Sequence, residues 1–409
     1  MDALAPDTNI VLRGAALVAA DRIVQRPLPI RAGHVASSAA ADAWQIDLRD
    51  HLIFPGLINA HDHLQVNAIP PLRADAPFAN SYEWIAAFRA HFDVPEVKAA
   101  LRVPKAVRLR HGATKNLLAG TTFVAHHDPW HPAMDDADFP VALLRDFGWS
   151  YALAGPAYGP PVRESFDATP AGRPWLIHLA EGTDEIAGAE LSQLQQLGCL
   201  ASTSVLIHGV GFSERDIQRV IDVGAAVVWC PTSNLSLLGK TLDPQRLHEA
   251  RHLALGTDSR LSGARDLLEE LRGVLYRHGL GAAQLLRLVT ADAARILREP
   301  HRGHLDTGAH ADLVVVADYG GDPVRNLVGI ERSRIRAVVR GGLPRITDPD
   351  FAEWFEHAGL ETVPVRLDGQ PKLLAKSLAD EAVIALEPGL DLLPRMKRPA
   401  SSQLLAEIG

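Results

Sequence analysis

Four short apolar runs, each ending in a histidine or an aspartate, constrain the fold of this chain more than any other feature. The first is Phe54-Pro-Gly-Leu-Ile-Asn-Ala-His61-Asp-His63, and the other three end at His178, His208 and Asp258. Short apolar runs bounded by turn residues are typical of strands buried on both faces, as in a parallel sheet. Polar residues at the carboxyl ends of such strands indicate an α/β fold, a (β/α)8 TIM-type barrel with its chemistry at that end.

The paired histidines of the first run predict half of a metal site. A strand turns alternate side chains to the same side, so His61 and His63 point together while Asp62 points away. Two imidazoles at this spacing suit a divalent cation. The motif is weak by itself, because 18 histidines in 409 residues make such a pair expected by chance. The other three runs turn it into a specific hypothesis.

The spacing of the runs gives their order in the predicted barrel. One strand-plus-helix unit separates His178 from His208, and two units separate His208 from Asp258, with a further strand at 225–230. If the paired-histidine run is the first strand, these three residues end strands five, six and eight.

The segment between His127 and His178 fits the barrel less well. It offers about 50 residues for three steps that each need roughly 25 to 30. One strand can be identified there, beginning at Trp149, and we expect a distorted barrel or a missing regular strand around residues 128–172. Before this sector, residues 97–118 form one helix-like segment.

The two ends of the chain predict a smaller β-domain. Residues 9–53 and 303–347 alternate short β-type runs with turns, and neither patch is large enough to bury a core alone. We expect a composite β-sandwich from residues 1–53 and 303–347, a metal-binding barrel from residues 54–302, and a C-terminal extension, residues 348–409, that packs on the barrel or at an oligomer interface.

Composition narrows the class of protein. Hydrophobic residues make up 47% of the chain and charged residues 22%, as in ordinary soluble globular proteins. The net charge of −8 and the pI near 6.1 argue against a nucleic-acid partner. Two cysteines, Cys199 and Cys230, imply no disulfide framework. No signal segment or membrane span is recognisable, so we expect a cytoplasmic protein without a membrane partner.

The ordered motifs resemble those of the amidohydrolase superfamily, and more narrowly its cytosine-deaminase-like and triazine-hydrolase-like subgroup. The motifs are Pro55-Gly-Leu-Ile-Asn-Ala-His61-Asp-His63, His178-Leu-Ala-Glu181, His208, Pro231-Thr-Ser-Asn234 and Gly256-Thr-Asp258. The resemblance covers roughly residues 9–347 and implies a barrel with a composite β-sandwich, and by habit of the superfamily a homodimer.

The resemblance also implies the site. It assigns one divalent metal ion, Zn²⁺ or Fe²⁺, to a set of four residues that we call the ligand set: His61, His63, His178 and Asp258. Glu181 and His208 would transfer protons. The chemistry agrees, because three imidazoles and a carboxylate suit these ions better than Mg²⁺, and a bound metal lowers the pKa of its water toward about 7. Asp258 and His208 would take and orient the water proton, and Glu181 would act as general acid and base.

Binuclear members of the superfamily carry a bridging lysine on a middle strand. No lysine lies between Lys115 and Lys240, so we expect one metal ion. The chain departs from the subgroup pattern at Leu72-Arg73-Ala74 and at Ser259-Arg260-Leu261, which leaves the substrate open. A small-molecule substrate is expected.

Polar and aromatic residues in the loops after the strands are candidates for substrate contact. They are Gln65, Asn67, Trp84, His127, Trp130, Tyr158, Asn234 and Arg260. His127 ends the second strand, and the planar fork of Arg260 could bind an anionic or carbonyl group. Each of these residues also has a structural interpretation as a packing, solvated or ion-paired side chain.

Three functions remain open from the sequence. The first is hydrolytic deamination of an amino-substituted N-heterocycle with release of ammonia. The second is hydrolysis of a cyclic amide, an N-alkylamine or a halide on a ring by the same site. The third is a non-catalytic metal-binding protein, which the presence of all the polar site residues argues against.

Overall fold

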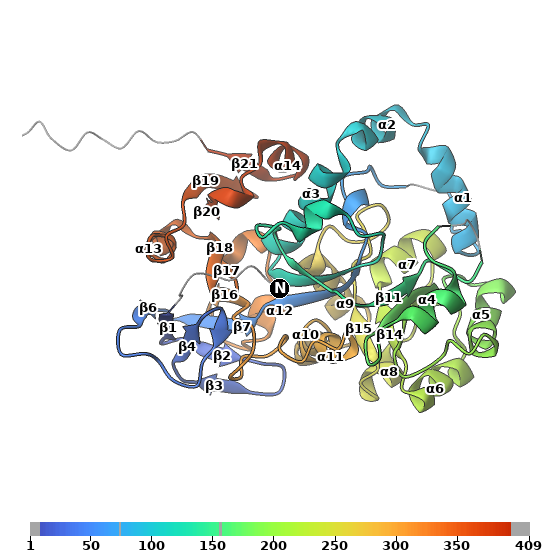
Figure 1. The fold of residues 1–409 in the computed structure, drawn as a ribbon, viewed down its shortest axis with the longest axis horizontal. Helices are drawn as coiled ribbons and strands as arrows, with labels where there is room; N and C mark the ends of the chain where they lie inside the picture. Colours follow the sequence, from blue (N-terminus) through green and yellow to red (C-terminus); the bar gives the residue numbers. More distant parts are fainter. Residues whose placement is uncertain (1–8, 73–74, 155–157, 394–409) are drawn as a thin grey trace, which may run out of the picture.

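The structure is a computed structural model that describes residues 9–72, 75–154 and 158–393. Its strands form four sheets. In Figure 1 the N-terminal strands (blue) and the C-terminal strands (orange to red) lie together on the left, and the middle of the chain lies on the right. No helix of the described residues is long and apolar enough to cross a membrane.

Eight strands in the middle of the chain carry the predicted site. They pair in parallel as a three-stranded sheet, β10-β9-β8, and a five-stranded sheet, β11-β12-β13-β14-β15. The strands are β8 (Leu57–Asp62), β9 (Thr121–His126), β10 (Ala142–Leu143), β11 (Gly148–Ser150), β12 (Trp175–Leu179), β13 (Ser204–His208), β14 (Ala226–Trp229) and β15 (Leu253–Leu255). Counted from β8, His178 and His208 lie on the fifth and sixth strands and Asp258 follows the eighth, in the predicted order.

The compressed sector contains two short strands, β10 and β11, where the sequence indicated one. Only residues 144–147 separate them, so this step has no crossover helix. Each pairs with a neighbour on its outer side, β10 with β9 and β11 with β12, and the described residues include no pairing between the two. The step from β9 to β10 contains only a 3₁₀ helix, η2 (Pro132–Asp135), so the sector is shortened by the loss of crossover α-helices rather than of a strand.

Helices follow most of the other strands. The segment expected as one helix over residues 97–118 is two, α2 (Pro95–Arg102) and α3 (Lys105–Leu118). Pro104 separates them, because proline restricts the residue before it to extended backbone, and Val103 has φ −62° and ψ 128°. The other helices around these strands are α1 (Ser81–His91), α4 (Val162–Ala168), α5 (Glu185–Gln196), α6 (Glu214–Val223), α7 (Pro231–Leu238), α8 (Gln245–Glu249), α9 (Leu267–Arg277), α10 (Ala282–Leu288) and α11 (Ala291–Ile296).

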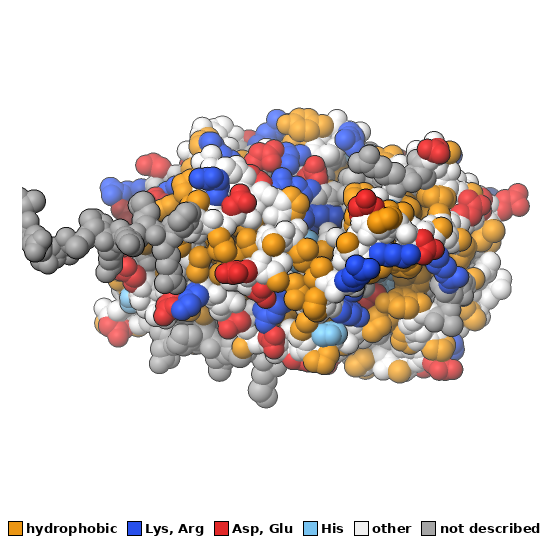
Figure 2. Space-filling model, turned by 90° about the horizontal axis from the view of Figure 1, so that it is seen from above, with side chains coloured by type: hydrophobic (Ala, Val, Ile, Leu, Met, Phe, Trp, Pro, Cys, Tyr) orange, Lys and Arg blue, Asp and Glu red, His pale blue; other side chains and the backbone are white. Residues whose placement is uncertain are grey.

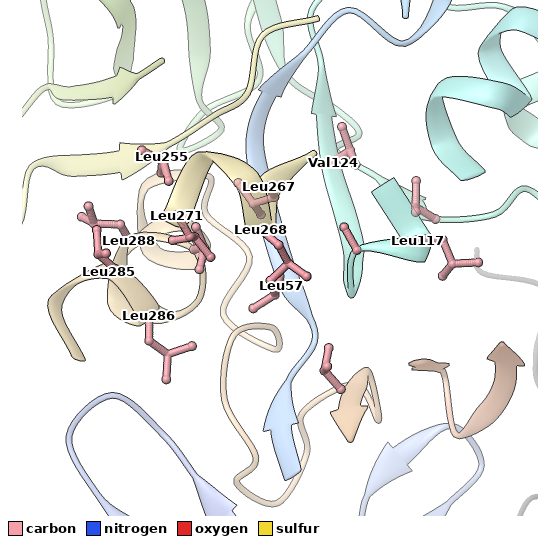
Figure 3. Close-up of a cluster of buried hydrophobic side chains, with 14 of the residues drawn as sticks. Leu57, Leu117, Val124, Leu255, Leu267, Leu268, Leu271, Leu285, Leu286 and Leu288 are labelled. Atoms are coloured by element: carbon pink, nitrogen blue, oxygen red, sulfur yellow. The ribbon is translucent and has the colours of Figure 1, made fainter. Parts of the chain in front are cut away.

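Alternate residues of the eight strands enter two different apolar clusters. Leu57, Val124 and Leu255 pack with helix residues such as Leu117 and Leu268 (Figure 3). Their neighbours along the strands, together with residues of α11, form a second cluster that unites both sheets. Its strand residues are Ile58, Ala60, Phe123, Ala125, Leu176, Val205, Ile207, Ala226, Val228 and Ala254. One face of the strands is therefore covered by helices, and the opposite faces meet one another.

The two chain ends meet in a nine-stranded sheet. The antiparallel pair of β7 (His51–Pro55) and β16 (Leu313–Ala317) in this sheet joins segments about 260 residues apart. The order is β21-β19-β20-β18-β17-β16-β7-β2-β3, with β2 (Ala16–Val18), β3 (Ile23–Gln25), β17 (Ile335–Arg340), β18 (Leu343–Thr347), β19 (Thr362–Leu367), β20 (Gln370–Ala375) and β21 (Leu390–Leu392). Only Gly56 separates β7 from β8, so this sheet holds the start of the strand that ends in the paired histidines.

A four-stranded sheet, β5-β4-β1-β6, completes the N-terminal part. Its strands are β1 (Asn9–Arg13), β4 (Leu28–Arg31), β5 (His34–Val35) and β6 (Trp44–Asp47). Its core is continuous with residues of β7 and β16 and includes Phe351 and Trp354 at the start of the C-terminal segment.

The rest of the C-terminal segment adds β19 to β21 to the nine-stranded sheet, with α13 (Ala352–His357) and α14 (Glu381–Leu386); α12 (Arg325–Val328) precedes β17. On the face in Figure 2, basic and acidic side chains are intermixed.

Candidate active site

The ends of β8, β12 and β15 bring the ligand set to one point. His63 Nε2 and His61 Nε2 lie 3.1 and 3.3 Å from His178 Nε2. Asp258 Oδ1 lies 3.8 Å from His63 Nε2 and 4.0 Å from His61 Nε2. Side chains separated by up to 197 positions in the sequence thus direct one ligand atom each into the same small volume.

The chemistry and the spacing of these atoms fit a divalent ion. Ligand atoms about 2.1 Å from a tetrahedral ion lie roughly 3.4 Å apart, close to the 3.1 and 3.3 Å that separate His178 Nε2 from the other two ring nitrogens. Burial lowers the pKa of both His61 and His178 well below the usual range, with neighbouring imidazoles contributing. Both rings are therefore neutral and can offer lone pairs to a cation.

Gly256, just after β15, permits this convergence. A Cβ at that position would lie 2.8 Å from His61 Cβ and 2.9 Å from its backbone nitrogen. The chain that carries Asp258 can therefore approach β8 closely only because this residue has no side chain. The close approach is fixed by a hydrogen bond from the backbone N–H of Asp258 to the His61 carbonyl, at 3.1 Å.

Three residues next to the site have left-handed backbone that is uncommon outside glycine. They are Ala180, with φ 52°, His208, with φ 77°, and Asp258, with φ 53°. Such conformations cost of order 1–3 kcal/mol each and persist where the surrounding structure fixes them. All three follow or end a strand of the central set, where the chain turns sharply to present a site residue.

Hydrogen bonds fix the orientation of Asp258. Its Oδ2 accepts hydrogen bonds from the hydroxyls of Ser233 and Ser262, at 2.8 and 3.1 Å, and its Oδ1 accepts one from the backbone N–H of Ser259, at 2.7 Å. Ser233 lies on α7, so this helix holds the carboxylate from one side.

Glu181 and His208 form a second pair beside the ligand set. Their side chains are buried, with Glu181 Oε2 3.7 Å from His208 Nε2. The Trp84 indole N–H donates to the other oxygen, Oε1, at 2.9 Å, and Asn234 Oδ1 lies 2.7 Å from His208 Nδ1. Burial raises the pKa of the Glu181 carboxyl to about 7, against an opposing effect of His208. A carboxyl group with that pKa can both take and give a proton near neutral pH.

Behind the paired histidines lies a buried ion pair. Asp62 points away from His61 and His63, as the strand alternation predicts, and its Oδ2 accepts from Lys115 Nζ and from Asn116 Nδ2, both at 2.8 Å. Asp62 and Lys115 are both completely buried. Lys115 lies on α3, so it neutralises Asp62 and anchors the end of β8 to that helix.

A pocket of about 340 Å³ opens over the site. His63, His178, His208 and Asp258 line it. Helix α1 supplies Trp84, Ile85, Phe88 and Arg89 to the wall, and Phe92 directly follows this helix. The remaining wall residues include Gln65, Val66, Asp128, Tyr151, Tyr158 and Leu261. The cavity therefore combines a polar base with apolar and aromatic walls.

Three of the expected substrate contacts, Gln65, Trp84 and Tyr158, line this pocket. The Gln65 side chain is buried and its Oε1 has no hydrogen-bond partner in the structure. A buried amide oxygen without a protein partner is suited to a ligand, because an unsatisfied buried acceptor is costly.

The structure does not bring the other candidates to the pocket wall. His127 is buried behind the ligand set, with its ring stacked on that of His178 at 4.4 Å. Asn234 orients His208. Arg260 turns away from the pocket and forms two hydrogen bonds with Glu387, at 2.8 and 2.9 Å. Glu387 therefore neutralises the guanidinium group that we had expected to bind an anionic or carbonyl group of the substrate.

Asn67 and Trp130 also lie apart from the pocket wall. Asn67 bridges Asp62 and the backbone of Arg260, with distances of 2.8 and 3.1 Å. Trp130 is 40% exposed, and its indole donates to Asp135. The departure noted at Arg73 and Ala74 lies outside the described residues.

Two residues of the site were missed by the sequence reasoning. Asp128 Oδ2 lies 2.6 Å from His63 Nδ1, and the Tyr151 carbonyl oxygen lies 2.7 Å from His178 Nδ1. Asp128 had a detectable signal, because it is a carboxylate that follows the strand ending at His126 and His127. The Tyr151 contact uses a main-chain atom, for which no residue pattern exists.

Comparison with known proteins places these features in a family. The profile described as Amidohydrolase family matches residues 162–344. A 5-methylthioadenosine/S-adenosylhomocysteine deaminase of Nitratidesulfovibrio vulgaris is 25% identical over 359 residues, which cover 75% of this chain and 80% of that protein. One of the same name from Halobacterium salinarum is 34% identical over 143 residues, or 32% of this chain and 33% of that protein.

Solved structures share the fold. An adenosine deaminase of Xanthomonas campestris with bound zinc matches with a TM-score of 0.65 and 19% identity, over 86% of this chain and 97% of that one. Atrazine chlorohydrolase of Arthrobacter aurescens TC1, complexed with zinc, matches with a TM-score of 0.63 and 18% identity, over 86% and 99% of the two chains. Together with the ordered motifs at the strand ends, these similarities agree with the resemblance to the amidohydrolase superfamily, with a family match over residues 162–344 and a fold shared with the solved structures.

Proposed function

We propose that the chain is a metal-dependent aminohydrolase that deaminates an amino-substituted N-heterocycle. The observation that carries this proposal is the convergence of the ligand set beside the Glu181–His208 pair, at an apolar pocket of about 340 Å³. The ligand set would hold one divalent ion, Zn²⁺ or Fe²⁺. Such an ion supplies a hydroxide nucleophile at neutral pH and polarises the group under attack.

The protein residues then have distinct tasks. In the reaction, a water oxygen bonds to the ring carbon that carries the amino group, one water proton passes to the adjacent ring nitrogen, and the other leaves with the amine as ammonia. Glu181 can carry the proton to the ring nitrogen, because Trp84 occupies its Oε1 and leaves Oε2 facing the site. Asp258, held by Ser233 and Ser262, accepts the second proton.

His208 stabilises charge on the attacking oxygen. Its Nδ1 is bound by Asn234 Oδ1, which only accepts, so Nδ1 carries a proton. When Nδ1 carries the only proton, the ring is neutral and its Nε2 lone pair points into the site. When both nitrogens are protonated, an Nε2–H points there instead. The second state is the one that assists attack, and Glu181 Oε2 lies 3.7 Å from that nitrogen.

The pocket supports a substrate with a flat, largely apolar body. Trp84, Phe88 and Phe92 contribute to its wall, and Gln65 offers an amide oxygen without a protein partner. Relatives that match most of this chain are named 5-methylthioadenosine/S-adenosylhomocysteine deaminases, so adenine derivatives with an apolar thioether group are the first substrates to test.

Ammonia release by metal-loaded protein tests the proposal. The panel contains 5′-thioether adenosines, adenosine, aminopyrimidines, aminopterins and amino-triazines. We expect stoichiometric ammonia and a product in which an oxygen from ¹⁸O-labelled water replaces the amino group. No release from any member, with one equivalent of bound metal confirmed, would contradict a deaminase and leave ring-amide hydrolysis to be examined.

The finer architecture is also a proposal. The apolar cluster that unites both central sheets supports a closed (β/α)8 barrel over residues 54–302, and the β7–β16 pairing supports a composite β-domain from both chain ends. The C-terminal segment continues the sheet of that domain through β18 and β20. A homodimer and a cytoplasmic location stay predictions from the sequence.

A further inference from the structure

The buried carboxylate of Asp128 is not used by the proposed reaction. Its side chain is 3% exposed, and Oδ2 lies 2.6 Å from His63 Nδ1. Oδ1 accepts a hydrogen bond from the Tyr158 hydroxyl at 2.5 Å. Within the described part of the chain, His63 is its one ion-pair partner, so this carboxylate is dedicated to one metal-ligand candidate.

Asp128 determines which nitrogen of His63 faces the metal position. A carboxylate accepts hydrogen bonds, so Nδ1 carries a proton and donates it to Oδ2. In the neutral ring, the form that binds a metal, the lone pair is then on Nε2, the atom that lies 3.1 Å from His178 Nε2 in the ligand set. An imidazole that donates to a carboxylate is also a more basic ligand than one that donates to a neutral group.

The other two imidazoles of the ligand set lack this support. His178 Nδ1 is bound to a neutral acceptor, the Tyr151 carbonyl, at 2.7 Å. His61 Nδ1 has no hydrogen-bond partner in the structure. Since only His63 has a carboxylate behind it, Asp128 is placed to contribute more to metal affinity than the partners of the other two rings.

Tyr158 connects this carboxylate with the substrate pocket. The tyrosine is 41% exposed and lines the pocket, where its ring packs edge-on against Tyr151 at 5.3 Å. Its hydroxyl donates inward to Asp128. A continuous chain of hydrogen bonds thus runs from the pocket wall through a buried carboxylate to His63.

We propose that Asp128 is a positioning residue for the metal, acting through His63, and that Tyr158 is a positioning residue for Asp128. The chain from Tyr158 to His63 holds the metal ligand in its binding tautomer and orientation. This inference rests on the proposed function only in the assignment of His63 as a ligand, and it requires no particular substrate.

The affinity for Zn²⁺ tests it in the absence of any substrate, by competition with a chromophoric chelator. Removing the partner of a metal-bound histidine typically weakens metal binding 10- to 100-fold. We expect a loss of about 100-fold for Asp128→Ala and about 10-fold for Asp128→Asn, since asparagine keeps an acceptor but not the charge. Tyr158→Phe should lose a few-fold, and Co²⁺-loaded variants should show altered visible absorption bands.

A double variant distinguishes the relay from two independent effects. Because Tyr158 acts through Asp128, Asp128→Ala combined with Tyr158→Phe should bind Zn²⁺ no more weakly than Asp128→Ala alone. Tyr82→Phe is the matched control, since it removes a phenol that donates to another buried carboxylate, Glu190, and that does not line the pocket. Its Zn²⁺ affinity should equal that of the wild type.

Unchanged Zn²⁺ affinity in Asp128→Asn and Tyr158→Phe, with wild-type circular dichroism, would overturn the proposal. So would additive losses in the double variant. If Asp128→Ala does not fold, these two milder variants decide the question. A protein with the expected affinity pattern but no deaminase activity would refute the proposed reaction and leave the relay standing.

Discussion

Trp84 is the residue whose role in catalysis can be tested most directly by a single substitution. Its N–H donates to Glu181 Oε1 at 2.9 Å. A hydrogen bond to a charged group contributes about 1.5–3 kcal/mol, so its loss should reduce kcat at least about tenfold. We therefore expect Trp84→Phe to lower kcat for ammonia release by this amount while the bound metal stays at one equivalent.

Trp130→Phe provides the matched comparison. That indole also donates to a carboxylate, Asp135, but at the surface and away from the pocket. Its kcat should equal that of the wild type. If Trp84→Phe raised KM and left kcat unchanged, Trp84 would be a binding residue and not a partner of Glu181.

Glu181 itself is expected to carry most of the proton transfer. General acid–base catalysis contributes roughly 10²- to 10⁴-fold to a rate, so Glu181→Gln should lower kcat within that range. Because Glu181 is outside the ligand set, metal content measured by atomic emission should not change. Turnover close to that of the wild type would remove Glu181 from the mechanism.

Among single residues, the sequence predicted the site residues at strand ends better than the residues that hold those site residues in place. His61, His63, His178 and Asp258 could be named because each follows an apolar run. Asp128 supports His63 from 65 positions away along the chain, and no local pattern encodes such a contact. Arg260 was assigned to the substrate because it neighbours Asp258, but its actual partner, Glu387, is 127 positions away.

Among the elements, helix α3 lies against the short 3₁₀ turn η1 (Leu64–Val66) that follows the paired histidines. Gly112 makes the approach possible, since a Cβ there would lie 2.3 Å from the Leu64 carbonyl oxygen. Gly112→Ala must therefore displace the backbone next to His63. We expect a loss of about 1–3 kcal/mol in the free energy of unfolding, typical of overpacking, and weaker Zn²⁺ binding.

Gly188→Ala tests the same substitution in a helix with free space. The nearest atom to a Cβ at this position of α5 is the Gly211 carbonyl oxygen, 3.9 Å away. Alanine favours helix over glycine by about 1 kcal/mol, so this variant should be equal to or more stable than the wild type in urea unfolding. Equal stability of the two variants would show that η1 is not held by α3.

A second element-scale prediction concerns α9 and α7. Glu270 of α9 is completely buried, and its Oε1 accepts from the backbone N–H of Thr232 in the first turn of α7, at 2.9 Å, while Oε2 has no hydrogen-bond partner in the structure. Burial raises the pKa of this carboxyl to about 7. Helix α7 also carries Ser233 and Asn234, so the state of Glu270 bears on the site.

The sign of the pH effect follows from that shift. The carboxyl of Glu270 has a higher pKa in the folded protein than in the unfolded chain, so its protonated form favours folding. This contribution to stability is complete below about pH 4.3 and is lost as the pH rises through about 7. Between pH 5 and 8 the wild type should lose up to about 3 kcal/mol from this group. The glutamine of Glu270→Gln cannot ionise, so urea unfolding at pH 5 and pH 8 should show the free energy of unfolding of this variant rising relative to that of the wild type. An equal difference between the two proteins at both pH values would contradict this.

The elements themselves were predictable where the signal is local. Apolar runs located β8, β12, β13 and β14. Strand β10 has only two residues, too few for any periodicity. The division of residues 97–118 at Pro104 was legible in the sequence, but the apolar pattern across it favoured one helix.

At the scale of the whole molecule, a buried ionic cluster joins the C-terminal segment to the loop of Asp258. Glu387 follows α14, its side chain is completely buried, and it accepts from Arg260, from Arg332 and, at 2.9 Å, from His111 of α3. These three residues come from the loop after β15, from the 3₁₀ turn η3 (Arg332–Arg334) before β17 and from α3, the helix that carries Lys115. The carboxylate therefore neutralises two arginines and joins three distant parts of the chain.

Glu387→Ala should destabilise the whole protein and loosen the site. Removing one partner of a buried charge pair costs about 3–5 kcal/mol, because Arg260 would remain largely buried without a carboxylate and Arg332 would keep only Asp368. Arg260 is two residues from Asp258, and its backbone N–H is bound to Asn67, so Zn²⁺ affinity should fall as well. Urea unfolding and chelator competition measure the two effects.

The control, Lys98→Ala, breaks an exposed pair with Asp93 and should change the free energy of unfolding by less than about 1 kcal/mol. Equal stability of the two variants would mean that residues 381–393 rest on the surface of the fold without joining its parts, whereas loss of stability with full Zn²⁺ affinity would confine their role to the fold.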